Sequence, residues 1–117
     1  MTTAVVTVQA DQPVREALRL LADRPFHQLP VLQGAWVVGV VSDRALFALL
    51  TRASQALDAR AGEVMAANPR CIAPEAAISE AARLLVHVGV CCLPVVHDGT
   101  KVLQGIVTAT DLLRMLL

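Results

Sequence analysis

Aromatic residues are the scarcest component of this 117-residue chain, which holds two Phe, one Trp and no Tyr. Proteins that bind single-stranded nucleic acids stack the bases on aromatic side chains, and this chain has too few of them to build such a platform. A surplus of positive charge is also absent, because Lys and Arg total 10 and Asp and Glu total 10. Broad attraction to phosphates needs a basic surface. We therefore predict no nucleic-acid partner.

The sequence also lacks the signs of a disulfide framework, a secretion signal and a membrane span. Its three cysteines are Cys71 and the adjacent Cys91 and Cys92, an odd count that favours a reducing compartment. The N-terminus has no basic region followed by a long apolar stretch. The apolar runs are interrupted well before the ~20 residues that a bilayer span needs. We expect a cytoplasmic protein with no membrane segment.

Apolar residues, in contrast, make up 56% of the chain, and charged residues only 17%. A chain of this size buries a core without disulfides or metal, but this composition leaves apolar surface for a second copy or a host domain to cover. Two leucine-rich segments, residues 46–50 and 112–117, are more apolar than one core-facing helical stripe requires. These segments predict a homodimer.

An internal repeat organises the chain. Residues 14–31 align with residues 78–95 at an offset of 64, and eight of the eighteen pairs are identical. After two extra residues in the second copy the offset becomes 66, and Gly39-Val40-Val41-Ser42 then aligns with Gly105-Ile106-Val107-Thr108. Two copies are too few for a solenoid, so they predict a pseudo-dimer of two similar units.

Each copy shows the pattern strand, helix, strand, strand, helix, which predicts an α/β (α+β) fold. Val14, Ala17, Leu18 and Leu21 share one face of the first helix, which Pro13 starts. The expected elements of the first copy are Val5–Val8, a helix from Pro13 to Pro25, Leu29–Leu32, Trp36–Val41 as a strand buried on both faces, and a helix capped by Ser42. Those of the second copy are Cys71–Ile72, Ala77–His87, Leu93–Val96, Lys101–Val107 and Ala109–Leu116, with a turn at Asp98-Gly99. We assign residues 1–53 to the first repeat, 54–62 to a linker and 63–117 to the second repeat. A short helical turn is expected at residues 62–67, where the linker meets the second repeat.

The stretch Gly105–Leu112 is the strongest candidate for a binding site, because a strand ends there and a helix begins. Helix N-termini present unpaired N–H groups and partial positive charge, which suit a phosphate. Thr108, Thr110 and Asp111 lie at this junction, whereas the first copy has Ala45 at the position of Asp111. The same residues fit a capping box, in which Thr108 and Asp111 bond each other's backbone N–H. Both interpretations remain open from the sequence.

With Leu-Pro-Val in the second strand and Gly-Val/Ile-Val-Ser/Thr before the last helix of both halves, the chain resembles a tandem pair of cystathionine β-synthase (CBS) domains, the Bateman module. The resemblance implies two β-α-β-β-α repeats packed through their sheets with pseudo-two-fold symmetry. It implies two clefts between the repeats that commonly bind adenosine nucleotides such as AMP, ADP or ATP, with no cofactor required. It also implies a module that commonly pairs into a disc-like dimer.

Carried over residue by residue, the resemblance implies that Thr108 contacts phosphate and that Asp111 accepts hydrogen bonds from the ribose hydroxyls. A carboxylate is a suitable acceptor for these hydroxyl groups. The remaining residues of this nucleotide cleft would be Thr3, Val6, Phe26, His27, Cys91, Ile106 and Thr110. A weaker second cleft would use Ser42 and Arg44, because Ala45 offers the ribose nothing. Its other wall would come from Asn68, Ile72 and Val90.

Other chemistry receives less support. His27, His87 and the cysteines show no ligand spacing for zinc, so the cysteines are interpreted as small core residues, and we expect no metal. His27 remains open between a cleft contact and a surface residue. Glu16 and Glu80, with Arg three residues later in each case, fit an i,i+3 ion pair better than catalytic carboxylates. No nucleophile triad, P-loop or Gly-rich dinucleotide loop is present, so we predict no enzyme.

Two functions therefore compete. The first is a regulatory module that senses an adenosine-type ligand between its repeats and passes the signal to a regulated protein or host domain. The alternative is a ligand-free structural module for dimerisation or partner docking. A shift in thermal stability with adenine nucleotides would separate the two.

Overall fold

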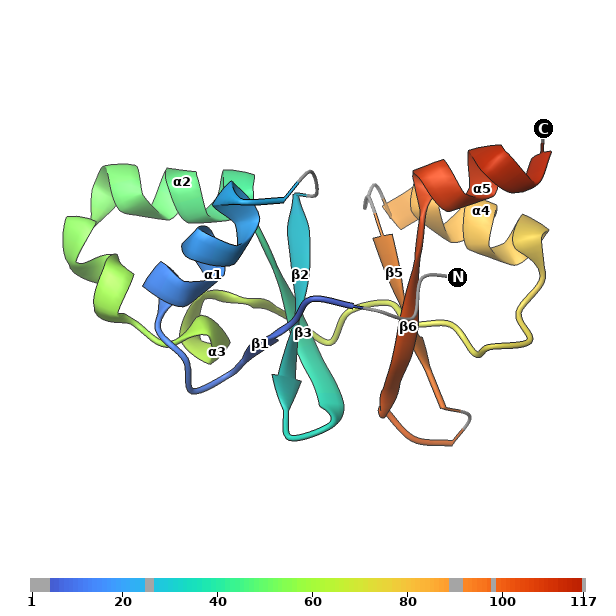
Figure 1. Ribbon diagram of the computed structural model, residues 1–117, viewed down its shortest axis with the longest axis horizontal. Coiled ribbons are helices and arrows are strands. Elements are labelled where there is room, and N and C mark those ends of the chain that lie inside the picture. The colour runs from blue at the N-terminus through green and yellow to red at the C-terminus, as the bar shows by residue number, and fades with distance from the viewer. Residues whose placement is uncertain (1–4, 25–26, 89–91, 98, 117) are drawn as a thin grey trace. The chain divides into compact units, whose positions relative to one another are not determined.

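The computed structural model describes residues 5–24, 27–88, 92–97 and 99–116, without the side chains of residues 88, 92 and 116. The chain divides into two compact units, Val6–Pro69 and a second unit formed mainly by Arg70–Leu117. Each unit combines a small sheet with helices (Figure 1), which confirms the predicted α+β class. The segment predicted as a linker lies within the first compact unit.

The first unit contains a four-stranded sheet in the order β1-β2-β3-β4. Strand β1 runs parallel to β2, and the remaining neighbours are antiparallel. The helices of this unit are α1 and α2, followed by a 3-10 helix η1 and a single helical turn α3. The bounds are β1 (Val8–Gln9), α1 (Val14–Ala22), β2 (Gln28–Gln33), β3 (Trp36–Ser42), α2 (Asp43–Arg52), η1 (Ser54–Asp58), α3 (Ala61–Val64) and β4 (Ala66–Ala67).

The second unit contains the antiparallel pair β5–β6 with helices α4 and α5. Its elements are α4 (Ile78–Val88), β5 (Cys92–Val96), β6 (Leu103–Thr108) and α5 (Ala109–Leu116). The strand predicted at Cys71–Ile72 is reduced to one parallel bridge between Ile72 and Val95. Gly99 adopts φ +76° in the predicted turn, while Asp98 lies outside the described residues.

Strand register repeats between the two units and confirms the internal alignment. Val8 pairs with Val31 in the first unit, and Ile72 pairs with Val95 in the second. Both hairpins carry an irregularity just after the matching valine, between Val31 and Leu32 and between Val95 and Val96. The cores match in the same way: Ala17, Leu21, Leu29 and Leu46 in the first unit correspond to Ala81, Leu85, Leu93 and Leu112 in the second, and all are buried.

The predicted burial pattern holds for α1 but fails for β3. Val14, Ala17 and Leu21 are buried on one face of the helix, as the spacing predicts. Strand β3 is not buried on both faces, because burial alternates along it and Trp36, where it begins, is 61% exposed. The prediction was wrong because an apolar run does not show which face of a strand the helices cover.

Residues 59–67 complete the first unit. The carbonyl of Ala59 accepts a bond from the Val14 N–H, and the N–H groups of Ala61 and Gly62 donate to the carbonyls of Gln12 and Ala10. Ala61 is fully buried in the core. The expected helical turn is therefore present as α3, but it ends at Val64 because β4 then pairs with β3.

No helix among the described residues is long and apolar enough to span a membrane.

Candidate functional site

The β6–α5 junction forms a reciprocal capping box. The Thr108 N–H donates to the Asp111 carboxylate oxygen Oδ2 at 3.0 Å, and the Asp111 N–H donates to Thr108 Oγ1 at 3.1 Å. Both residues are half-buried, and Thr110 between them is exposed. The capping interpretation of these two residues is confirmed. Their geometry fixes both side chains at the start of α5.

A capped junction still has groups that a ligand could use. Thr108 Oγ1 accepts the bond from Asp111, so its hydroxyl hydrogen remains able to donate, for example to a phosphate oxygen. Asp111 uses Oδ2 in the box, and its Oδ1 accepts neither of these bonds. The N-terminus of α5 adds partial positive charge at the same place. The junction thus combines a donor for an anion with an acceptor for a hydroxyl group.

The matching junction of the first unit has only half of this arrangement. Ser42 caps α2 by accepting a bond from the Ala45 N–H at 3.2 Å. Ala45 cannot return a side-chain bond. Instead, the backbone carbonyl of His27 accepts from the Asp43 N–H, and His27 Nδ1 lies 2.8 Å from Asp43 Oδ2. Sequence reasoning missed the contact with Asp43, which no spacing rule predicts.

The predicted site residues fall into three groups. Ile106, Thr108, Thr110 and Asp111 lie together in the second unit. Val6 and His27 belong to the first unit, where the His27 side chain is exposed. Thr3, Phe26, Cys91 and Val90 lie outside the described residues.

The weaker set is also divided. Ser42 and Arg44 lie at the start of α2, and Asn68 follows β4 in the first unit with φ +54°. Ile72 is buried in the core of the second unit. The proposed ligand contacts of all these residues remain predictions.

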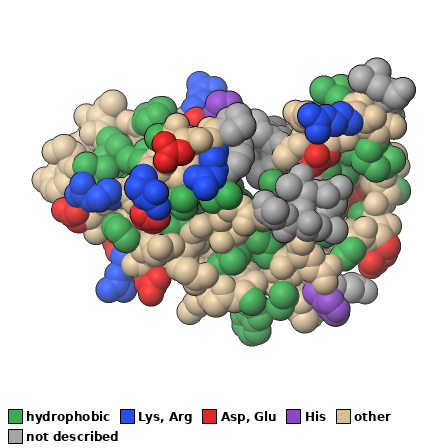
Figure 2. Space-filling view, viewed as in Figure 1, with side chains coloured by type: hydrophobic (Ala, Val, Ile, Leu, Met, Phe, Trp, Pro, Cys, Tyr) green, Lys and Arg blue, Asp and Glu red, His purple; other side chains and the backbone are tan. Residues whose placement is uncertain are grey.

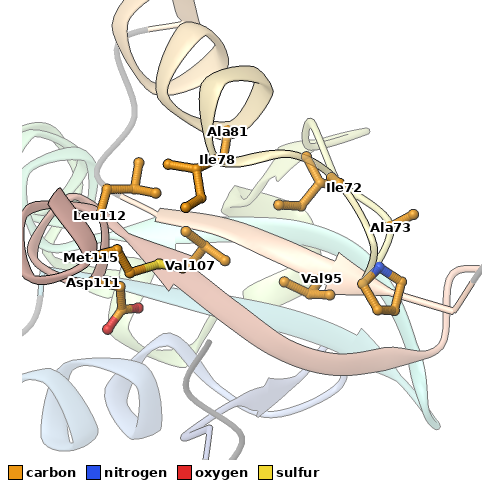
Figure 3. A pocket seen from close by; sticks show the side chains of 11 residues that line it. Ile72, Ala73, Ile78, Ala81, Val95, Val107, Asp111, Leu112 and Met115 are labelled. Atoms are coloured by element: carbon orange, nitrogen blue, oxygen red, sulfur yellow. The ribbon is translucent and has the colours of Figure 1, made fainter.

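A cavity of about 130 Å³ opens in the second unit and has Asp111 among its lining residues (Figure 3). Its walls are largely apolar and come from the segment before α4, from α4 itself, from both strands and from α5. Ile78, Val107 and Leu112 face one another, with Asp111 and Met115 at the α5 side. The sequence contained no separate signal for this pocket.

The titratable side chains of the described residues include one ion pair on α1 and one partly buried thiol. Arg19 Nε donates to Glu16 Oε2 at 3.0 Å, which confirms the ion pair predicted for the first repeat and holds the pKa of Glu16 below its usual value. Burial raises the pKa of the Cys71 thiol, although nearby Lys101 acts in the opposite direction. No cluster of three metal-ligating side chains occurs within the described residues.

The surface mixes charges and exposes several large apolar residues. Basic and acidic side chains lie next to each other on the face shown in Figure 2. Phe47 on α2 is 57% exposed, while Leu113 and Met115 on α5 are 61% and 57% exposed. These residues belong to the two leucine-rich segments for which the sequence predicts a covering partner.

Comparison with known proteins identifies the repeat unit. The family model of the CBS domain matches residues 1–52 and again residues 61–117. The structure of CBSX2 in complex with AMP is 31% identical, has a TM-score of 0.86 and aligns over 99% of this chain and 91% of that chain. A putative acetoin utilization protein (AcuB) from Vibrio cholerae is 28% identical, with a TM-score of 0.87 over 99% and 85% of the two chains.

Longer proteins also contain a similar region. An inosine-5'-monophosphate dehydrogenase from Korarchaeum cryptofilum is 30% identical over 112 residues, which cover 92% of this chain and 21% of the enzyme. A second relative, protein MJ0188 from Methanocaldococcus jannaschii, is 28% identical, and the match covers 41% of its length. The chain therefore spans less than half of these two relatives.

Proposed function

Because this chain belongs to the CBS domain family and carries two copies of the repeat, we propose that it is a regulatory module that binds an adenosine-type nucleotide, AMP, ADP or ATP, at the β6–α5 junction. The observation that carries the proposal is the side-chain arrangement of Thr108 and Asp111. A relative of 31% identity that forms a complex with AMP supports the ligand class.

The capping box would prepare the junction for the ligand. It orients the Asp111 carboxylate before binding, so that Oδ1 accepts a bond from a ribose hydroxyl without a further loss of side-chain freedom. The Thr108 hydroxyl and the helix N-terminus would receive a phosphate. The remaining residues of the predicted set, Ile106, Cys91, Thr3, Val6, Phe26 and His27, stay predicted contacts of the nucleotide on the family resemblance.

The first-unit junction would bind the same ligand weakly, since Ser42 and Arg44 provide phosphate contacts but Ala45 provides no acceptor for the ribose. Regulation would follow from a difference in ligand affinity between two arrangements of the module.

We further propose a cytoplasmic homodimer held by the exposed apolar residues of α2 and α5. Sedimentation at micromolar concentration tests the dimer, and a monomeric mass would contradict it.

Thermal unfolding with AMP, ADP and ATP tests the nucleotide proposal. A ligand at 100 times its dissociation constant adds roughly 2.7 kcal/mol to the free energy of unfolding. We expect the wild-type protein to be stabilised by at least one of the three nucleotides. Asp111→Ala should lose this stabilisation, and so should Asp111→Asn, which keeps an oxygen for the Thr108 N–H but loses the negative charge.

Ser42→Ala is the matched control, because it removes the corresponding cap bond of the first unit and leaves the proposed ribose acceptor intact. This variant should keep the nucleotide effect despite a lower starting stability. Equal stabilisation of wild type and Asp111→Asn would contradict the site. The absence of any shift with the three nucleotides would instead favour the structural module, for which the capping box alone explains Asp111.

A further inference from the structure

A polar cavity of about 370 Å³ opens in the first unit, where the end of β1, the β2–β3 turn and the start of α3 meet (Figure 1). All of its lining residues belong to this unit, and none of them is in the predicted nucleotide sets. Its volume is near the lower end of the range for small-molecule sites, roughly 300–1,000 Å³. The cavity is therefore large enough for a small ligand of its own.

The walls of this cavity are held by hydrogen bonds between segments that are distant in the sequence. The Gln9 side chain bonds the Gly34 backbone twice: Nε2 donates to the carbonyl and Oε1 accepts from the N–H, both at 3.0 Å. The Ala10 N–H donates to the Leu32 carbonyl at 2.8 Å, and the Gly62 N–H donates to the Ala10 carbonyl at 2.9 Å. The cavity is therefore preorganised, and a ligand does not have to order it.

The Gln9 bonds are specific to the first repeat. At the offset of 64 residues, Gln9 corresponds to Ala73, whose methyl side chain cannot form such bonds. The second unit still forms its β5–β6 hairpin, and Ile72 still pairs with Val95. The fold of the repeat thus does not depend on these two bonds, which distinguish the cavity from the corresponding region of the second unit.

Two opposite charges line the cavity without neutralising each other. Asp11 and Arg60 are both exposed, and within the described part of the chain neither of them takes part in an ion pair. A phosphate at this place would be repelled by the carboxylate, and a metal ion would be repelled by the guanidinium. A molecule that carries both an ammonium group and a carboxylate group satisfies both side chains.

An aromatic side chain lies beside these charges. Trp36 is the cross-strand partner of Gln33, which lines the cavity, and Trp36 is 61% exposed. Side chains directly opposite each other on antiparallel strands lie on the same face of the sheet. The indole therefore provides an apolar surface next to the cavity, and Leu32 contributes aliphatic surface to the lining. Both surfaces favour a ligand with an apolar side chain.

We propose that this cavity binds a free α-amino acid with an apolar side chain. Arg60 binds the carboxylate of the ligand, Asp11 binds its ammonium group, and its side chain packs on Trp36. The two charged ends of a peptide move apart by about 3.5 Å with each added residue, so a cavity of this size favours a single amino acid. The inference does not depend on nucleotide binding.

Trp36 is the single tryptophan of the chain, so its fluorescence reports on this cavity. We expect a titration with leucine, methionine or phenylalanine, without nucleotide, to give a saturable change in its emission for at least one of the three. The N-acetyl derivative of that amino acid lacks the ammonium charge, and its amide lacks the carboxylate charge. Each derivative should bind at least about tenfold more weakly, because it loses one charge-assisted contact.

Arg60→Gln and Asp11→Asn should each weaken binding of the same amino acid at least about tenfold. Both side chains are exposed, so both variants should fold, and their urea midpoints check that they do. Arg52→Gln is the matched control, because Arg52 is also exposed but does not line the cavity, and it should bind as the wild type does. No saturable change with any of the three amino acids at millimolar concentration would overturn the proposal. Equal affinity of the wild type and either cavity variant, or equal affinity for the amino acid and its amide, would overturn it as well.

Discussion

Gly39 in β3 lies against residues 65 and 66, and a methyl group at this position would test that packing directly. A Cβ added to Gly39 would lie 2.3 Å from Met65 Sδ, 2.7 Å from Met65 Cγ and 2.9 Å from the backbone oxygen of Ala66. The thioether could rotate away. The carbonyl is less free to move, because β4 pairs with β3 at Gly39–Ala67 and Val40–Ala66.

Gly39→Ala should therefore destabilise the protein. Overpacking of this kind costs about 1–3 kcal/mol. The smaller conformational entropy of the unfolded Ala chain returns about 0.4–1 kcal/mol. We expect a net loss of about 1–2 kcal/mol in the free energy of unfolding, visible in urea as a lower midpoint with an unchanged slope.

A double-mutant cycle with Met65→Ala separates the clash from other effects. Removal of the thioether should relieve the part of the cost that comes from the sulfur and Cγ, which gives a coupling of at least about 0.5 kcal/mol. The remainder belongs to the Ala66 carbonyl. An unchanged or higher urea midpoint for Gly39→Ala, or strict additivity with Met65→Ala, would refute this account of the contact.

Two further predictions concern the caps and Cys71. Ser42→Ala and Thr108→Ala should each lower the free energy of unfolding by about 1 kcal/mol through a lost N-cap bond, and equal urea midpoints for variant and wild type would contradict this. Burial raises the pKa of the Cys71 thiol, so its alkylation, followed by mass spectrometry, should have a pH midpoint above the ordinary value of 9.0. The thiol of the urea-unfolded protein is not buried, so its pKa should be lower. The free energy of unfolding should therefore fall as the pH rises through about 9, because the folded protein holds the thiol proton more tightly. Identical alkylation midpoints for the folded and unfolded protein would contradict the burial effect.

The sequence predicted what depends on periodicity and on the repeat. The α1 face, the two hairpins and the matching register all follow from residues that recur at offsets of 64 and 66. The capping box was one of two open interpretations of Asp111, because Thr followed three residues later by an acid is a local pattern. Local patterns therefore carried most of the successful predictions.

Features that depend on contacts between distant segments were not predicted. The docking of residues 59–62 on α1 and the contact between His27 and Asp43 join segments that no periodicity relates.

Calorimetric titration of the wild type with AMP, together with Asp111→Asn, tests the central claim most directly. The account predicts one strong site per chain, lost or greatly weakened in Asp111→Asn, while Ser42→Ala retains it. Two equal sites per chain, or the same affinity for AMP in wild type and Asp111→Asn, would contradict the assignment of the nucleotide to the β6–α5 junction.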